Sequence, residues 1–218
     1  MRSFRAVAAG VTGVLVGAGA MGGCSDGAPT SNRIPAGQGV VVVRLTDAPF
    51  PFDEVESVDA FVVRIDARLT ETTESEAAVV DEAAAEEGGW VTIAEPNASF
   101  DLLTLRGGNT ANLGQSTLLA GDYRSLRLIL DVDQSSITLK DGTILTGTSS
   151  PSILFPSAGH TGIKILLNEP VSVEDGSTTN LLIDFDVGES FIMRGTSLQQ
   201  NGLLFKPVVK ATVQEPAQ

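Results

Sequence analysis

The strongest constraint on the fold is a period-two alternation of apolar and polar residues in two long segments. From Asp59 to Leu69, one set of alternate positions is apolar (Phe61, Val63, Ile65, Ala67, Leu69) and the other is mostly polar (Val62, Arg64, Asp66, Arg68). In the second segment, Leu126, Leu128, Leu130 and Val132 alternate with Arg127, Ile129 and Asp131. Because successive side chains of a strand point to opposite faces, both segments are predicted strands with one face in a core and one in water.

Shorter apolar runs predict further strands, and turn signals such as Asp141-Gly142 and Asp175-Gly176 separate them. These candidate strands are Val40 to Leu45, Trp90 to Ala94, Ser136 to Lys140, Gly162 to Leu167, Asn180 to Val187 and Leu203 to Val213. No helices of βαβ spacing lie between them. The sequence therefore predicts an all-β fold, and specifically a single antiparallel β-sandwich.

The first 24 residues have the layout of an export signal. Two arginines precede an uncharged stretch of 18 residues from Ala6 to Gly23, which Cys24 follows. The segment Ala20-Met21-Gly22-Gly23-Cys24 resembles the lipobox of bacterial lipoproteins, which implies removal of residues 1–23 and acylation of Cys24. We therefore expect a lipid anchor in a bilayer of the cell envelope, and Ser25 favours the outer membrane by resemblance to enterobacterial sorting. An uncleaved membrane anchor is the alternative.

The rest of the chain divides by composition. Residues 24–38 are rich in Pro, Gly, Ser and Asn, and we expect a flexible tether there. Residues 39–213 are the predicted sandwich domain, and residues 214–218 are a short tail. Within the domain, residues 71–88 are an acidic insertion rich in Glu and Ala, which we expect to be a solvated connection between two strands. A lobe that collects cations is the alternative for this insertion.

Charge argues against nucleic acid as a partner. The chain has 14 Lys and Arg against 27 Asp and Glu, a formal net charge of −13, and its sequence shows no cluster of basic residues. A polyanion would have to approach against that field. The single Cys and the single His also exclude a disulfide framework and a Cys/His zinc site.

An ordered set of short motifs resembles the family named domain of unknown function 4382, over about Gly39 to Val213. The motifs are Leu45-Thr46-Asp47-Ala48-Pro49, Asp101-Leu102-Leu103 with Leu105, Ala120-Gly121-Asp122-Tyr123 before Leu126-Arg127-Leu128, Gly162-Ile163-Lys164, Leu182-Ile183-Asp184-Phe185-Asp186 and Lys206-Pro207-Val208-Val209. The resemblance implies a transthyretin-like or carboxypeptidase-regulatory-like β-sandwich, often on exported or lipid-anchored proteins. It implies no activity, and the acidic insertion departs from the shared pattern.

Three of these motifs also have physical explanations. Asp47 suits a turn that ends the first strand, with its side chain accepting from nearby backbone N–H groups. Tyr123 is expected to pack at the edge of the sandwich with its hydroxyl bonded to backbone. Pro207 cannot donate to a strand ladder, so it implies an edge strand or a bulge.

No catalytic motif is complete in the sequence. Four G-x-S segments lack the second Gly of a nucleophile elbow. His160 lies in a loop and is the one candidate base, although a solvated side chain is the expectation. Paired carboxylates could serve a glycosidase, but spacing along the chain does not give their separation. We expect no enzyme activity, and an exported hydrolase that uses His160 or paired acids is the alternative.

Five aspartates are the clearest candidate for a metal site. Asp131 and Asp133 share a predicted strand face, as do Asp184 and Asp186. Two strand ends could converge with Asp47 into an oxygen cage suited to Ca²⁺, which makes a calcium-stabilised adhesion domain a second alternative. The other interpretation is that these are solvent-facing carboxylates, and we expect no cofactor beyond this possible Ca²⁺.

Aromatic residues supply the candidate ligand contacts. Phe50 and Phe52 lie in a Pro-rich loop that offers them little core, and Trp90 begins a strand. Exposed aromatic rings can stack sugars, but packing within the domain is the simpler expectation for all three. The leading functional expectation is a non-catalytic, lipid-anchored envelope module that binds a glycan or an envelope protein, or contributes to surface assembly.

Overall fold

The computed structural model describes residues 34–48, 53–69, 89–156 and 162–214 of the chain. All of these belong to one compact unit, Arg33–Gln218. The predicted signal peptide, Cys24, the acidic insertion, Phe50, Phe52 and His160 lie outside the described residues.

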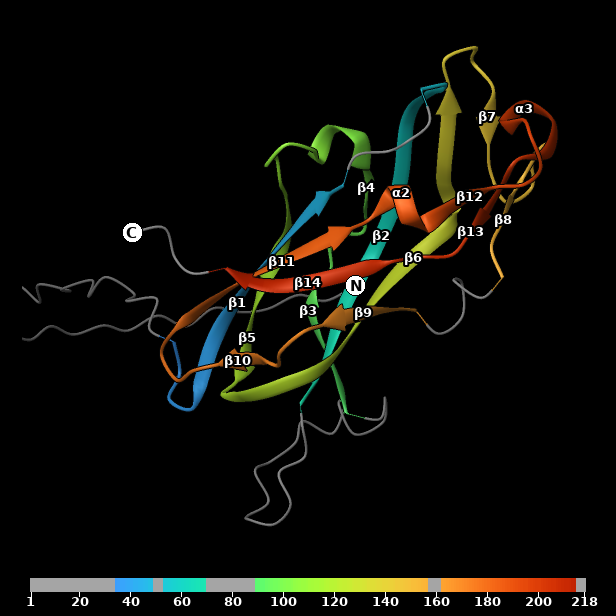
Figure 1. The fold of residues 1–218 in the computed structure, drawn as a ribbon. Helices are drawn as coiled ribbons and strands as arrows, with labels where there is room; N and C mark the ends of the chain where they lie inside the picture. The colour runs from blue at the N-terminus through green and yellow to red at the C-terminus, as the bar shows by residue number, and fades with distance from the viewer. Residues whose placement is uncertain (1–33, 49–52, 70–88, 157–161, 215–218) are drawn as a thin grey trace, which may run out of the picture. The chain divides into compact units, whose positions relative to one another are not determined.

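Strands make up most of the described chain (Figure 1). The main strands are β1 (Gln38–Asp47), β2 (Val55–Leu69), β3 (Trp90–Ala94), β4 (Ala98–Asp101), β5 (Ala111–Leu119), β6 (Gly121–Leu139), β9 (Ile163–Leu167), β10 (Val171–Val173), β11 (Thr178–Phe185) and β14 (Val209–Gln214). The short elements are η1 (Leu102–Leu105), β7 (Ile144–Leu145), β8 (Ile153–Leu154), α2 (Val187–Ser190), β12 (Phe191–Met193), α3 (Leu198–Asn201) and β13 (Leu203–Phe205). None of the helices in the described part of the chain has the length and apolar character needed to span a bilayer.

The main sheet is large and nearly closed. Its strands follow the order β3-β2-β6-β9-β14-β11-β1-β5, and β4, β7 and β10 pair beside this path. The end strands β3 and β5 are not hydrogen-bonded neighbours on that path, but they contact each other. The two strands are close at this seam: if Gly114 of β5 carried a Cβ, that atom would lie 3.5 Å from the Cβ of Ala94 in β3. The two ends of the sheet therefore approach as in a barrel.

The prediction of an all-β fold is confirmed, but the prediction of an antiparallel sheet is wrong. β1 pairs with β11 in parallel, and β14 pairs with β9 in parallel. Figure 1 shows β1 and β11 side by side although most of the chain separates them. Alternation within a segment reports which face is buried, but it does not report the direction of the neighbouring strand. The sheet is thus mixed and barrel-like.

The core forms from alternate residues, but bulges change the phase of the alternation. In β2, Val58, Ala60 and Val62 are buried, and after a register shift between Val62 and Arg64 the buried apolar residues are Ile65 and Ala67. The predicted apolar face that includes Phe61 and Val63 is therefore wrong in its first half. A bulge inserts a residue into one strand, so it moves every following side chain to the other face.

A bulge also joins two predicted strands into β6. Between the pairs Asp59–Ser136 and Phe61–Asp131, β6 has four residues, 132–135, whereas β2 has only one. Asp131 Oδ1 accepts from the N–H groups of Asp133 and Gln134, and the Ser135 hydroxyl donates to the Asp131 carbonyl. The strand thus continues through a side-chain-capped bulge instead of ending there.

Two local predictions can be compared with the structure directly. Tyr123 is buried, and its hydroxyl donates to the Leu119 carbonyl at 3.0 Å, which confirms the expected backbone bond. Burial raises the pKa of the Tyr123 hydroxyl. Pro207 lies between β13 and β14, so the predicted strand Leu203 to Val213 is interrupted at residues 206–208. The chain there forms neither an edge strand nor a bulge.

Candidate functional site

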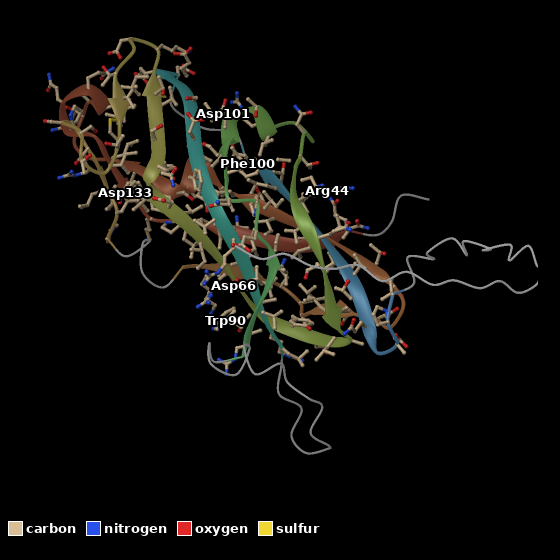
Figure 2. The ribbon with its side chains drawn as sticks, turned by 180° about the vertical axis from the view of Figure 1, so that it is seen from behind. Arg44, Asp66, Trp90, Phe100, Asp101 and Asp133 are labelled. Atoms are coloured by element: carbon tan, nitrogen blue, oxygen red, sulfur yellow. The ribbon has the colours of Figure 1, made fainter. Side chains whose placement is uncertain are left out.

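Four cations from three separate segments of the sequence gather on the outer face of β3, β2, β6 and β9. The strand registers place Thr92, Asp66, Arg127 and Lys164 in one row across these four strands. In the next row, Trp90 is opposite Arg68, which is opposite Ser125. We call this surface the basic face, and it comprises Arg64, Asp66, Arg68, Trp90, Thr92, Ser125, Arg127 and Lys164. Figure 2 shows Asp66 and Trp90 near each other on it, with Asp133 toward the other end of β6.

Asp66 is the single acid on the basic face, and it is 1% exposed. Its Oδ2 accepts from Arg127 Nε at 2.8 Å, and both of its oxygens lie 3.2 Å from Arg64 Nε. The Thr92 hydroxyl donates to Oδ1 at 2.9 Å. A buried carboxylate needs this number of charged and polar partners to offset its lost hydration.

Arg127 is held from two sides. Its guanidinium carbon lies 4.5 Å from the centre of the Trp90 ring, a cation–π contact, while Nε bonds to Asp66. Its stem passes close to Gly162, where a Cβ would lie 3.5 Å from Arg127 Cδ and 2.5 Å from Ile129 Cδ1. Gly162 also has a φ of +77°, so a side chain there would be strained and would displace the neighbours of Arg127.

Lys164 is exposed and lies directly opposite Arg127 in the β6–β9 ladder. Among the described residues, neither Lys164 nor Arg68 has an acidic side chain at salt-bridge distance. A groove of about 380 Å³ runs beside Lys164, lined by Trp90, Ser125, Leu126, Arg127 and Gly162. A second groove of about 580 Å³ continues from Gly162 and Lys164 toward Lys206 and Pro207.

The basic face is positively charged, although the chain as a whole is negatively charged. It carries four cations and one carboxylate, whereas the whole chain has a formal net charge of −13. The absence of a Lys/Arg cluster in the sequence is therefore misleading, because strand pairing brings together residues from position 64 to position 164. Such a surface attracts anions from solution, an effect that salt screens.

Asp47 ends β1 in a different environment. It is 6% exposed, its Oδ1 accepts from the Val187 N–H at 3.1 Å, and its buried Oδ2 has no hydrogen-bond partner in the structure. Burial, and secondarily the charge of Asp184, raise the pKa of Asp47 to about 7, although the backbone bonds from Val187 and Ala48 act in the opposite direction. The predicted backbone bond thus exists, but its donor Val187 comes from the far end of the chain.

Two further acids lie near Asp47. Asp184 is in β11, which pairs with β1 in parallel, and Asp186 directly follows the end of β11. Asp184 Oδ1 is also buried without a partner, and burial followed by the charge of Asp186 raises the pKa of Asp184, against the attraction of Lys210. Asp186 caps α2 by accepting from the Glu189 N–H at 3.0 Å, and it pairs with Lys210 at 3.4 Å. The end of β1 and β11 therefore collects carboxylates, of which Asp47 is the most buried.

The five-aspartate metal cage is not assembled. Within residues 34–48, 53–69, 89–156 and 162–214, no three His, Cys, Asp or Glu side chains are grouped so that they could hold a metal ion. Asp131 and Asp133 belong to the β6 bulge, where the Gln134 side-chain amide and the backbone lower the pKa of Asp131. Asp47, Asp184 and Asp186 lie near one another, but Asp131 and Asp133 do not join them, because β6 pairs with β2, β7, β9 and β10 and not with β1 or β11.

Trp90 is the one predicted ligand contact that the described residues include, and it does line a groove. One face of its ring is covered by Arg127, so it does not offer that face to a sugar. Asp66, Arg127 and Lys164 were not predicted as site residues from the sequence. The alternation of the strands indicates that these residues lie on the outer face, but it does not indicate which strands are neighbours.

The comparisons with known proteins give a family and a distant structural likeness. The profile of the family described as a domain of unknown function (DUF4382) matches residues 38–207. No curated protein is significantly similar in sequence. The crystal structure of a candidate cell adhesion protein from Bacteroides fragilis aligns with 84% of this chain at 12% identity and a TM-score of 0.30. The aligned part is 47% of that protein, about half of its length. By its match over most of its length, this chain belongs to the DUF4382 family.

Proposed function

We propose that this protein is a non-catalytic binding module of the cell envelope and that the basic face is its binding surface. The observation that carries this proposal is the row Thr92–Asp66–Arg127–Lys164, where a chain of net charge −13 concentrates positive charge beside a groove. The acid of the row is neutralised by Arg64 and Arg127, so the groove itself is positive.

The proposal extends to how the domain is displayed. Residues 1–23 are a lipoprotein signal, Cys24 is the acylated residue, and the following tether holds the domain at the outer membrane. A diacylated residue gives stable anchoring, whereas one acyl chain alone binds a bilayer with an association constant of only about 10⁴ M⁻¹. Radiolabelled palmitate incorporation that is lost in Cys24→Ser would support this part, and incorporation that persists would contradict it.

The non-catalytic part of the proposal is supported by the chemistry of the basic face. Among the residues that the structure describes, the one acid of the basic face is Asp66, and it is paired with Arg64 and Arg127. The most perturbed acid, Asp47, does not line either groove beside β9. A broad hydrolase screen on the soluble chain should show no turnover, and turnover lost in His160→Ala would contradict the proposal.

The binding test uses residues 25–218, which contain the whole compact unit, and isolated cell envelopes. Lys164→Glu should reduce co-sedimentation with the envelopes, because it places a negative charge opposite Arg127. Lys140→Glu is the matched control, since Lys140 is also exposed and lies just beyond the other end of β6. Equal binding by the two variants would reject the basic face as the binding surface.

A further inference from the structure

We propose that the groove of the basic face takes a carboxylated sugar, a uronic acid unit of an acidic polysaccharide, with its carboxylate at Lys164. This inference rests on the proposed function, because it names the class of ligand for the same surface. Three features of the groove support it: the position of Lys164 directly opposite Arg127 with no acidic partner among the described residues, a lining suited to a sugar ring, and the position of Trp90.

The first feature is the cross-strand pair Arg127–Lys164. Side chains directly opposite each other in antiparallel strands have Cβ atoms about 5 Å apart, and like charges at that position repel. Asp66 lies on the far side of Arg127, and its oxygens already accept from Arg64, Thr92 and Arg127. Lys164 therefore faces the groove with a positive charge that no described acid compensates. A bound carboxylate between Lys164 and Arg127 would turn this repulsion into two attractive contacts.

The second feature is the shape and lining of the groove. Its volume of about 380 Å³ lies in the range of small-ligand sites. Its walls combine the Ser125 hydroxyl, the Trp90 indole and the backbone of Gly162 with the two cations. A sugar acid presents hydroxyl groups, apolar C–H groups and one carboxylate, so it uses all of these groups. An inorganic anion would use only the cations, and a flat membrane surface would not enter the groove.

The third feature is Trp90. Arg127 covers one face of its ring, so the indole acts as a positioning residue that holds the guanidinium near the groove. Trp90 is also the one Trp of the chain, so its fluorescence reports on the groove alone. Binding can thus be followed without a label and without interference from another indole.

The experiment titrates residues 25–218 with trigalacturonate and follows Trp90 fluorescence at low salt. The expected result is a saturable change that weakens as salt is added. Lys164→Glu should bind at least about tenfold more weakly, because a charge-assisted contact is worth about 1.5–3 kcal/mol and about 1.4 kcal/mol is a factor of ten. Lys140→Glu should bind as the unchanged protein does, and circular dichroism checks that both variants are folded.

The same titration with other compounds tests alternative ligands. An equal response to the methyl ester of trigalacturonate would overturn the proposal, because the ester lacks the negative charge. An equal response to sodium sulfate would mean an adventitious ion only, and a response to phosphatidylglycerol vesicles alone would assign the face to a membrane surface. If Lys164→Glu loses envelope binding but trigalacturonate does not bind, the ligand class is wrong and the proposed function stands. If Lys164→Glu keeps full envelope binding, the proposed function itself fails.

Discussion

Asp47 and Asp66 are both buried aspartates of the same sheet, but their surroundings differ completely. Asp66 has two arginines and a threonine hydroxyl on its two oxygens. Asp47 has a bond from the Val187 N–H, an unpartnered Oδ2, and a second carboxylate nearby at Asp184. The comparison teaches that the partners of a buried acid, and not its depth alone, decide whether its charge supports the fold.

The largest expected effect comes from removing the charge of Asp66. Asp66→Asn should lower the free energy of unfolding by about 3 kcal/mol at pH 8, because it leaves Arg64 and Arg127 without their counter-ion. Both arginines are partly exposed, so the expected loss of stability lies at the low end of the range for breaking a buried ion pair. Urea denaturation measures the change. A loss below about 0.5 kcal/mol would mean that water replaces the carboxylate and that the pairing contributes little.

The same substitution at Asp47 should have the opposite effect, an increase in the free energy of unfolding. The pKa of Asp47 is 3.8 unfolded and about 7 folded, so between these values the folded state holds a proton that the unfolded state has released. Stability from this group is therefore full below pH 3.8 and falls as the pH rises to about 7. Asp47→Asn should therefore raise the free energy of unfolding at pH 8, by at most about 1.4 kcal/mol for each unit of the pKa difference, and should change it little at pH 4.

Denaturation of both proteins at pH 4 and pH 8 separates this contribution from that of other acids. The difference between Asp47→Asn and the unchanged protein cancels groups such as Asp131, whose pKa shifts the other way. A destabilised Asp47→Asn at pH 8 would contradict the contrast with Asp66. It would mean that the Asp47 charge is stabilised by groups beyond Val187 and Ala48.

A smaller effect is expected at the acidic end of β11. Asp186→Ala should lower the free energy of unfolding by about 1 kcal/mol, since it removes the cap on α2 and the contact with Lys210. Thermal unfolding provides the measurement, with Glu189→Ala as a control in the same helix. A control that is equally destabilised would show that the cap itself contributes nothing.

The smallest effect is expected at Trp90. Trp90→Leu should lower the free energy of unfolding by about 0.5 kcal/mol, because it removes the cation–π contact with Arg127 and leaves the Asp66 pair in place. Trp90→Phe should lose less than Trp90→Leu, because it retains an aromatic face. The reverse order would mean that the indole packs against the sheet and does not hold the guanidinium.

Strand prediction worked where the local pattern was strong. Trp90–Ala94 has the predicted bounds, and β9 and β11 differ by a few residues at their ends. β5 was missed because its chain contains Gly114 and several polar residues, and a bulge at Leu113 disturbs its alternation. Bulges in β2 and β6 likewise shifted faces that a simple period of two had assigned.

The candidate site was less predictable than the fold. Asp131, Asp133, Asp184 and Asp186 were grouped because acids recur on alternating strands, but the sheet order separates β6 from β11. The basic face was overlooked for the opposite reason, since its cations are isolated in the sequence. Neither error could be corrected without the strand registers.

Local alternation and turn residues were sufficient to predict an all-β chain and the places of several of its strands. The family resemblance was also visible in the order of the motifs, and the family match confirms it. Three facts were visible only once the chain was folded: the sheet is mixed, Asp66 has ion-pair partners whereas Asp47 Oδ2 has no partner, and Arg127 lies opposite Lys164. The physical reason is that these facts depend on pairing between distant strands, which the alternation of one segment leaves open.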